Sequence, residues 1–212
     1  MKNFVTLLCL CFAVATFSGN AGATVLFTDN FNAENGGTGV LNYYGLSQWN
    51  VTSGSVDLIG NSHGSNFYDF YPGNGLYLDM DGSTYHAGTI QTKTSFNFLP
   101  GTYTLTFDLG GNHLGAPTDS MLLTVGLGSL FSKNYSLASG APYALVTETF
   151  TVNTAATGSL IFNHAGVDNM GMILDNVTLS YAPVPEPGTM MLLGIGMLGM
   201  AVYGKRRMNK EA

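Results

Sequence analysis

From Thr24 onward the chain alternates short runs of apolar and polar residues, which Gly, Asn, Ser and Thr separate. Alternation with a period of two residues is typical of half-buried β-strands, and no segment of this region shows the 3.6-residue period of a helix. The clearest strand is predicted at residues 101–110, directly after a turn at Pro100 and Gly101. Its apolar side chains all point to one face: Tyr103, Leu105, Phe107 and Leu109.

The same reasoning predicts eleven further strands, at residues 25–27, 48–52, 55–59, 76–79, 88–92, 94–98, 120–125, 130–135, 145–152, 158–164 and 172–180. A dozen short strands with turns between them predict an all-β fold, a two-sheet antiparallel sandwich of jelly-roll type. A barrel is the alternative that the pattern leaves open. Residues 60–75 are rich in Gly, Asn and aromatics, so we expect a long loop over one end of the sandwich, where binding tends to occur.

The first 23 residues have the layout of a cleavable signal peptide. One Lys precedes an apolar core, and small residues stand at Ala21 and Ala23. We expect cleavage after Ala23; an uncleaved anchor is less favoured, because the apolar stretch is shorter than the roughly 20 residues of a spanning helix. Both cysteines, Cys9 and Cys11, lie in this segment, so the mature domain has no disulfide, thiol nucleophile or cysteine metal ligand.

The C-terminal end carries a second apolar segment, from Thr189 to Gly204, followed at once by Lys205, Arg206 and Arg207. As a helix this run is about 24 Å long, against roughly 30 Å for the hydrocarbon core of a bilayer. Positive charge favours the cytoplasmic side of a membrane. We therefore expect a short transmembrane helix at 189–204 and a cytoplasmic tail at 208–212; the alternative is a buried core helix.

Residues 183–207 resemble the PEP-CTERM sorting signal of exopolysaccharide-producing Gram-negative bacteria. Pro185, Glu186 and Pro187 match its motif position for position, and the apolar run and the basic cluster follow. The resemblance implies export, an inner-membrane-anchored precursor, and cutting near the motif by an exosortase-like enzyme. The mature protein would then reach the cell surface or the extracellular matrix. The same tail is also known as an ice-binding protein C-terminal domain, a name that implies no ice activity.

The segment between the two ends, residues 24–182, has the length of one domain. Its charge excludes one class of partner. Only 9% of the whole chain is charged, against roughly 25% in typical soluble domains. This segment has two basic residues, Lys93 and Lys133, against eleven acidic ones. Nucleic acid is therefore not expected as a partner, because phosphate binding needs clustered Lys and Arg.

The middle segment also resembles, more loosely, the galactose-binding-like jelly rolls that PEP-CTERM proteins often carry, through residues 49–60, 71–84, 99–111 and 172–180. That resemblance implies carbohydrate binding through loops at one end and, in many members, a structural calcium. Sugars need flat apolar faces together with amides and carboxylates. The candidate ligand-binding residues are Tyr43, Tyr44, Asn61, Asn66, Phe67, Tyr68, Asp69 and Tyr71. The alternative is that these aromatics cover sheet edges; Trp49 is favoured as a core residue.

Asp29 and Asp175, near the two ends of the domain, are candidate calcium ligands; the competing interpretation is that each caps a turn. The four histidines are scattered, so zinc is not expected. No catalytic residue is assigned, because no nucleophile elbow or phosphate-binding loop is found. Three classes remain: a non-catalytic sugar-binding module, a structural or adhesive matrix protein, and, least favoured, a glycosidase with two carboxylates about 5 to 10 Å apart in a cleft.

Overall fold

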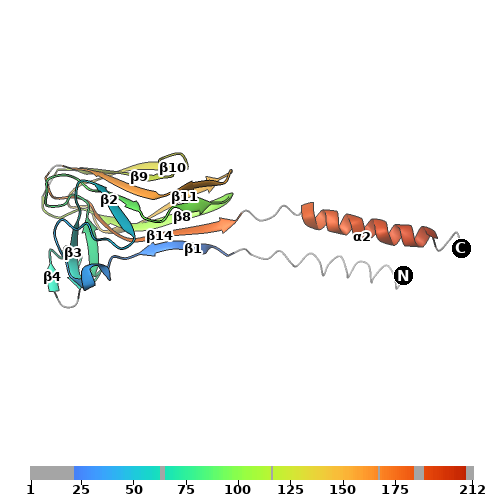
Figure 1. Ribbon diagram of the computed structural model, residues 1–212, viewed down its shortest axis with the longest axis horizontal. Helices are drawn as coiled ribbons and strands as arrows, with labels where there is room; N and C mark the ends of the chain where they lie inside the picture. The colour runs from blue at the N-terminus through green and yellow to red at the C-terminus, as the bar shows by residue number, and fades with distance from the viewer. Residues whose placement is uncertain (1–21, 63–64, 116, 167, 184–188, 209–212) are drawn as a thin grey trace. The chain divides into compact units, whose positions relative to one another are not determined.

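Two antiparallel β-sheets face each other in the computed structural model, which describes residues 22–62, 65–115, 117–166, 168–183 and 189–208 (Figure 1). The larger sheet runs in the order β11 (Ala144–Val152), β8 (Gly101–Gly110), β14 (Ile173–Pro183), β5 (Leu76–Asp79), β3 (Asp57–Ser62) and β4 (Ser65–Phe67), with β1 (Thr24–Asp29) beside β14. The second runs in the order β10 (Phe131–Leu137), β9 (Asp119–Val125), β13 (Leu160–Ala165), β6 (Thr89–Thr92) and β2 (Trp49–Ser53).

Four further elements lie outside the two large sheets in the described chain. β7 (Phe96–Phe98) and β12 (Ala156–Gly158) form a two-stranded ribbon, and a short 3₁₀ helix, η1 (Glu34–Gly37), follows β1. The helix α2 (Thr189–Met208) lies outside the compact unit of contacts, which spans Ala23–Pro183.

The connections between strands confirm the jelly-roll sandwich. The chain passes from one sheet to the other in β1 to β2, β2 to β3, β5 to β6, β8 to β9, β10 to β11 and β13 to β14. Every ladder is antiparallel, and among the described residues no strand of one sheet pairs with a strand of the other. The two sheets therefore pack as layers and do not close into a barrel.

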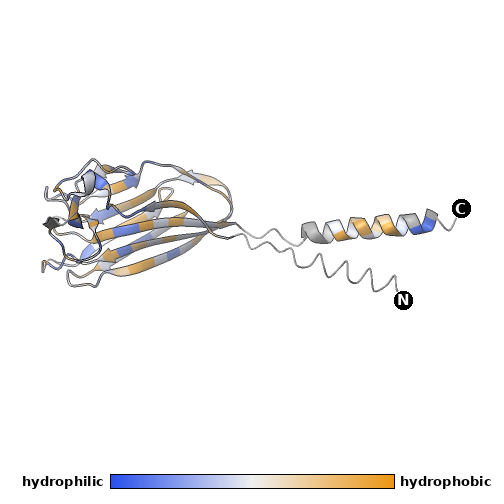
Figure 2. Cartoon of the chain, turned by 90° about the horizontal axis from the view of Figure 1, so that it is seen from below, coloured by the Kyte–Doolittle hydropathy of each residue, from blue (hydrophilic) through white to orange (hydrophobic). Residues whose placement is uncertain are grey.

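All twelve strands predicted from the period-two pattern are present, and the bounds at 76–79 and 101–110 agree residue for residue. The pattern missed β4 and β12. Each has only three residues, too short a run for alternation to be recognised. Figure 2 shows the alternation that carried the prediction, as hydrophilic and hydrophobic residues follow one another along the strands.

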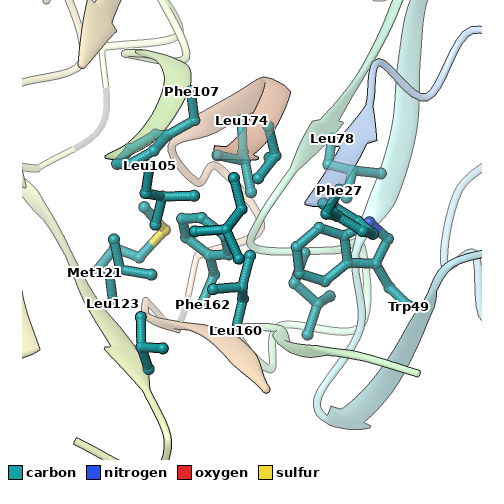
Figure 3. Close-up of a cluster of buried hydrophobic side chains, with 14 of the residues drawn as sticks. Phe27, Trp49, Leu78, Leu105, Phe107, Met121, Leu123, Leu160, Phe162 and Leu174 are labelled. Atoms are coloured by element: carbon teal, nitrogen blue, oxygen red, sulfur yellow. The ribbon is translucent and has the colours of Figure 1, made fainter. Parts of the chain in front are cut away.

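The core fills the space between the two sheets. On β8 every second side chain from Tyr103 to Leu109 is buried, as the sequence predicts. Trp49 is fully buried in the core, and its ring packs edge-on against Phe27 with 5.3 Å between centroids. Figure 3 shows the side chains that meet here from both sheets: Phe27, Trp49, Leu78, Leu105, Phe107, Met121, Leu123, Leu160, Phe162 and Leu174. Because the core is continuous, the loops at the ends of the strands are held on a rigid scaffold.

Candidate functional site

The predicted loop at residues 60–75 is in part a hairpin, and this corrects the sequence-based expectation. β3 continues to Ser62 and pairs with β4, with Gly60 opposite Phe67 and Asn61 opposite Asn66. Gly60 permits this continuation, because its φ is +113° and a Cβ there would collide with the carbonyl oxygen of Gly75. The true loop is therefore shorter and runs from Tyr68 to Gly75.

The buried hydroxyl of Tyr77 on β5 holds this loop in place. It accepts hydrogen bonds from the backbone N–H groups of Phe70 (2.6 Å) and Tyr71 (3.0 Å) and donates one to Asp69 Oδ1 (3.1 Å). Burial raises the pKa of Tyr77 above 10, so the hydroxyl stays protonated and donates. The candidate Asp69 is thus committed to the scaffold and supports the loop.

Tyr71, another candidate, also has a scaffold role. Its hydroxyl donates to the carbonyl oxygens of Gly111 and Ala141, and its ring stacks on Tyr143 with 4.6 Å between centroids. These contacts join the loop to two segments that are distant in sequence. Tyr71 does not line any of the hollows described below.

A depression of about 180 Å³ lies beside this loop. Its rim has three exposed apolar side chains, Leu41, Tyr68 and Leu114, and its interior carries two carboxyl groups, Asp57 and Asp79. The full set of lining residues is Leu41, Asp57, Ile59, Tyr68, Phe70, Asp79, Ser83, Leu114, Asn169 and Met170. Apolar rim and polar interior together give the mixed surface that a sugar ring requires.

Tyr68 is the most conspicuous residue of the rim. It is 56% exposed, and its backbone has a φ of +52°, a left-handed conformation that bulky residues rarely adopt. Its ring packs edge-on against Phe67, with 5.0 Å between centroids. Strained backbone that presents an exposed ring concentrates at functional sites, because packing elsewhere must hold it.

Two acidic residues face each other across the ladder between β3 and β5. Asp57 and Asp79 are register partners. Asp57 Oδ1 accepts hydrogen bonds from the N–H groups of Asn42 (2.6 Å) and Ser83 (3.2 Å), and its Oδ2 accepts one from Ser83 Oγ (2.6 Å). Asp79 Oδ1 accepts from the N–H groups of Asp81 (2.9 Å) and Gly171 (2.8 Å).

The environment of Asp79 favours the protonated form of its carboxyl group. Burial raises the pKa of Asp79 well above its usual value, and the charge of Asp57 opposite raises it further. In its protonated form the carboxyl group of Asp79 can donate a hydrogen bond as well as accept one. The hydrogen bond from the Asp81 N–H to Asp79 also closes a turn directly after β5.

The remaining candidates from the sequence are dispersed. Tyr43 packs against the core and approaches Glu34 Oε2 at 3.5 Å through its hydroxyl. Tyr44 is exposed and lines a different hollow, described below. Asn61 is exposed on β3; Asn66 lies on β4, and its side chain is outside the described set. Phe67 is half-buried beside Ile59 and Tyr77.

Sequence reasoning missed most of the lining of the depression. Leu41, Asp57, Ser83, Leu114 and Asn169 come from five separate segments, and no local pattern connects them. One signal was available, since Asp57 and Asp79 each stand at the edge of an apolar strand, where a carboxyl group needs a reason to be buried.

The two candidate calcium ligands are both buried, and each already has protein donors. Asp29 Oδ1 accepts from the N–H of Phe31 (3.0 Å) and Oδ2 from Trp49 Nε1 (2.9 Å). Asp175 Oδ1 accepts from the N–H of Asn176 (2.7 Å) and Oδ2 from the Tyr143 hydroxyl (2.9 Å). Within the described part of the chain, no group of three or more His, Cys, Asp or Glu is arranged to hold a metal. Such occupied oxygens fit turn capping better than a calcium site, and calcium stays a prediction.

The sorting residues lie mostly at or beyond the ends of the described ranges. Pro185, Glu186, Pro187 and Ala21 are outside them, and Ala23 is exposed. Lys205, Arg206 and Arg207 belong to the last turns of α2, where the side chains of Arg206 and Arg207 are exposed. A helix is present where the transmembrane helix was predicted, and it extends to Met208. Among the described residues, however, no helix combines the length and the hydropathy that a membrane crossing needs.

The C-terminal segment has a recognised counterpart. Residues 183–207 match the PEP-CTERM protein-sorting motif. The match has the bounds expected from the sequence, so the tail of this chain is a protein-sorting signal. No curated protein matches the chain.

Several solved structures are similar in fold and distant in sequence. The C-terminal CBM6 of the laminarinase LamC from Zobellia galactanivorans is 12% identical, with a TM-score of 0.41 over 74% of this chain and 98% of that one. The CBM22-1 xylan-binding domain from Paenibacillus barcinonensis is 11% identical, with a TM-score of 0.41 over 77% and 97%. The K3 adhesin domain of Lys-gingipain from Porphyromonas gingivalis is 16% identical, with a TM-score of 0.44 over 75% and 99%. At such scores these matches say nothing about what this chain binds.

Proposed function

We propose that the sandwich is a non-catalytic module that binds an extracellular glycan, and that the C-terminal signal delivers it to the cell surface or the extracellular matrix of a Gram-negative bacterium. The observation that carries the proposal is the depression beside Tyr68. An exposed ring held in a strained backbone stands next to the hydrogen-bonding groups of Ser83, Asp79 and Asn169. An aromatic face covers the C–H surface of a sugar, while such polar groups pair its hydroxyls.

The two carboxyl groups in the depression raise the question of a glycosidase. Directly opposed residues of an antiparallel pair have Cβ atoms about 4.5–5.5 Å apart, which is near the spacing of a retaining enzyme. However, Asp57 already accepts three hydrogen bonds from the protein, which occupy most of the lone pairs that a base or nucleophile would use. Asp79 is almost fully buried. The hydrogen bonds and the burial of this pair therefore argue against a catalytic role.

Delivery rests on the tail. The exposed apolar side chains of α2 point in all directions around the helix: Ile195, Met197, Leu198, Met200, Val202 and Tyr203. Such a helix needs an apolar environment, and Arg206 and Arg207 fit the charged boundary of a membrane. In this proposal the tail holds the precursor at the inner membrane until an exosortase-like enzyme cuts near Pro185 to Pro187. The extended backbone that prolines favour suits such a substrate.

Glycan binding is tested with the full chain, purified in detergent, by affinity electrophoresis in gels that contain laminarin, xylan or galactan. We expect retardation by at least one of these neutral glycans and about tenfold weaker binding for Tyr68→Ala, since an aromatic contact contributes roughly 0.5–1.5 kcal/mol beyond its buried area. Leu145→Ala is the matched control, because Leu145 is exposed on β11 and lines none of the hollows described. Equal binding by the wild type and Tyr68→Ala would contradict the proposal.

Delivery is tested by mass spectrometry of the protein from the native host. We expect a mature C-terminus near Pro187 and a mature N-terminus at Thr24. Replacement of Pro185 and Pro187 by Ala should leave the precursor uncut. A secreted protein that still ends at Ala212 would refute processing at the motif.

A further inference from the structure

A second, broader hollow of about 490 Å³ is lined by Tyr44, Ser53, Gly54, Thr84, His86, Ala87 and Gly166. It shares a wall with the depression beside Tyr68. Ser83 lines the depression and Thr84 lines the broader hollow, and adjacent residues have Cα atoms only about 3.8 Å apart. The segment 41–44 also contributes to both hollows, because Leu41 lines the depression and Tyr44 lines the broader hollow.

The shared wall is a turn, residues 82–86, that is fixed on both sides. The N–H of Gly82 donates to the carbonyl oxygen of Ser55 (3.0 Å), and the N–H of Ser55 donates to that of His86 (3.0 Å). The hydroxyl groups of Ser55 and Thr84 are hydrogen-bonded, with 2.6 Å between Oγ and Oγ1. Ser83 donates hydrogen bonds to Asp57 through its N–H and its hydroxyl. These hydrogen bonds anchor the turn that contributes Ser83 to the depression and Thr84 and His86 to the broader hollow.

The turn carries a second strained and exposed tyrosine. Tyr85 is 60% exposed and has a φ of +61°, so it repeats both properties of Tyr68. It stands between Thr84 and His86, which both line the broader hollow. The exposed Tyr44 lines the same hollow. Tyr85 is not itself a lining residue of either hollow. It is an exposed residue, in a backbone conformation that local preference disfavours, of the turn that contributes Ser83 to the depression and Thr84 and His86 to the broader hollow.

From this we infer that the ligand is a polysaccharide chain that crosses the turn at residues 82–86 and occupies both hollows, so that the module recognises several consecutive sugars. This inference rests on the proposed glycan-binding function and adds to it. A module that recognised only a chain end or a single sugar would need the depression alone. The broader hollow adds hydroxyl, imidazole and aromatic groups at a second position, and two linked contacts strengthen each other's binding.

Isothermal titration of the full chain in detergent with oligosaccharides of one to six units, prepared from laminarin, xylan and galactan, tests the inference. For the series that binds, we expect affinity to rise at least tenfold from the shortest bound oligomer to the longest. In Tyr85→Ala the shortest oligomer should bind as it does to the wild type, while the gain from added units falls about three- to tenfold. Tyr85→Phe keeps the ring and should retain the gain. Tyr68→Ala should weaken every length.

The outcomes separate the two proposals. Binding that does not depend on length, or a Tyr85→Ala variant with the full gain, would refute the two-hollow inference and leave glycan binding intact. Binding of no oligosaccharide and no parent polysaccharide would refute both. Because Tyr85 is exposed, the variants should fold, and circular dichroism checks this.

Discussion

Asp57 and Asp79 lie directly opposite each other on β3 and β5, two carboxyl groups at one position of an antiparallel ladder. Like charges in this arrangement destabilise a sheet. The protein limits that penalty by burying Asp79, whose pKa rises well above its usual value, while three hydrogen bonds stabilise Asp57. The raised pKa of Asp79 thus reduces the repulsion between the two carboxyl groups.

This arrangement predicts a pH-dependent stability. Because the folded-state pKa of Asp79 is raised, its contribution is fully present below about pH 4, the unfolded value, and is lost as pH rises through the folded pKa, by up to about 1.4 kcal/mol per pH unit. In Asp79→Asn the side-chain oxygen can still accept from Asp81 and Gly171. We expect its free energy of unfolding to exceed that of the wild type above neutral pH and to approach it near pH 4. Urea titration at pH 4, 6 and 8 measures this, and a parallel pH profile would contradict it.

His164 and Asp119 predict a compensation at acidic pH. Burial lowers the pKa of His164 to about 4, whereas burial and the charges of Asp168 and Asp81 raise that of Asp119 to about 7. The 3.9 Å approach of His164 Nε2 to Asp119 Oδ1 is therefore not an ion pair at neutral pH. As pH falls from about 6.5 to 4, the contribution of His164 to the free energy of unfolding decreases. As pH falls from about 7 to 4, the contribution of Asp119 increases.

Replacement of one of these two residues should reveal the pH dependence of stability that the other contributes. We expect His164→Gln to gain more stability than the wild type between pH 7 and pH 4.5, since the rise from Asp119 is no longer offset. Asp119→Asn should show the reverse. Thermal melts across this range measure both slopes, and identical slopes in all three proteins would exclude the compensation.

Tyr77→Phe should weaken binding without any change in the lining of the depression. The lost hydroxyl leaves the N–H groups of Phe70 and Tyr71 without their partner, at about 1–3 kcal/mol. We expect a lower melting temperature, faster hydrogen exchange at residues 68–75 and weaker glycan binding. Tyr103→Phe is the control, because that buried hydroxyl donates only to Leu99. If both variants bind equally well, the loop does not depend on Tyr77.

Asp29 predicts a structural role tied to the core. Asp29→Ala leaves the Trp49 indole and the Phe31 amide unpaired, so we expect a loss of about 2–3 kcal/mol in unfolding free energy. Asp108→Ala, which loses one exposed bond to Asn176, should change stability by less than about 1 kcal/mol. We also expect equal melting temperatures in calcium and in EGTA. A rise with calcium that Asp29→Asn abolishes would instead establish the ion.

We expect the charge of a glycan to affect its affinity for this protein. The two lysines of the domain are engaged elsewhere, Lys93 with the carbonyl oxygen of Leu46 (2.6 Å) and Lys133 with Glu148 (2.5 Å), and neither hollow has a Lys or Arg in its lining. We expect alginate, a polyuronate, to bind more weakly than neutral glycans, with the difference shrinking as salt screens the repulsion. Leu114→Lys places a cation at the exposed rim and should raise alginate affinity. Tight alginate binding by the wild type would contradict this.

The sequence by itself determined the strands, the sandwich and the sorting signal, because each is written in a local pattern. The alternation along residues 101–110 can be recognised from residues that are close together in sequence. The match at 183–207 is likewise one continuous segment. The predicted loop at residues 60–75 is a loop only from 68 to 75, because β4 is too short for its alternation to be recognised.

Only the tertiary structure decided which residues form the site. Asp57, Leu114 and Asn169 are brought together by strand pairing and by the connections between sheets, which no periodicity encodes. The same packing gives Asp69 and Tyr71 scaffold contacts, with the Tyr77 hydroxyl and with the carbonyl oxygens of Gly111 and Ala141. The composition of the sequence indicated which kinds of side chain could bind a sugar. Long-range contacts determine which of these side chains already form hydrogen bonds within the protein.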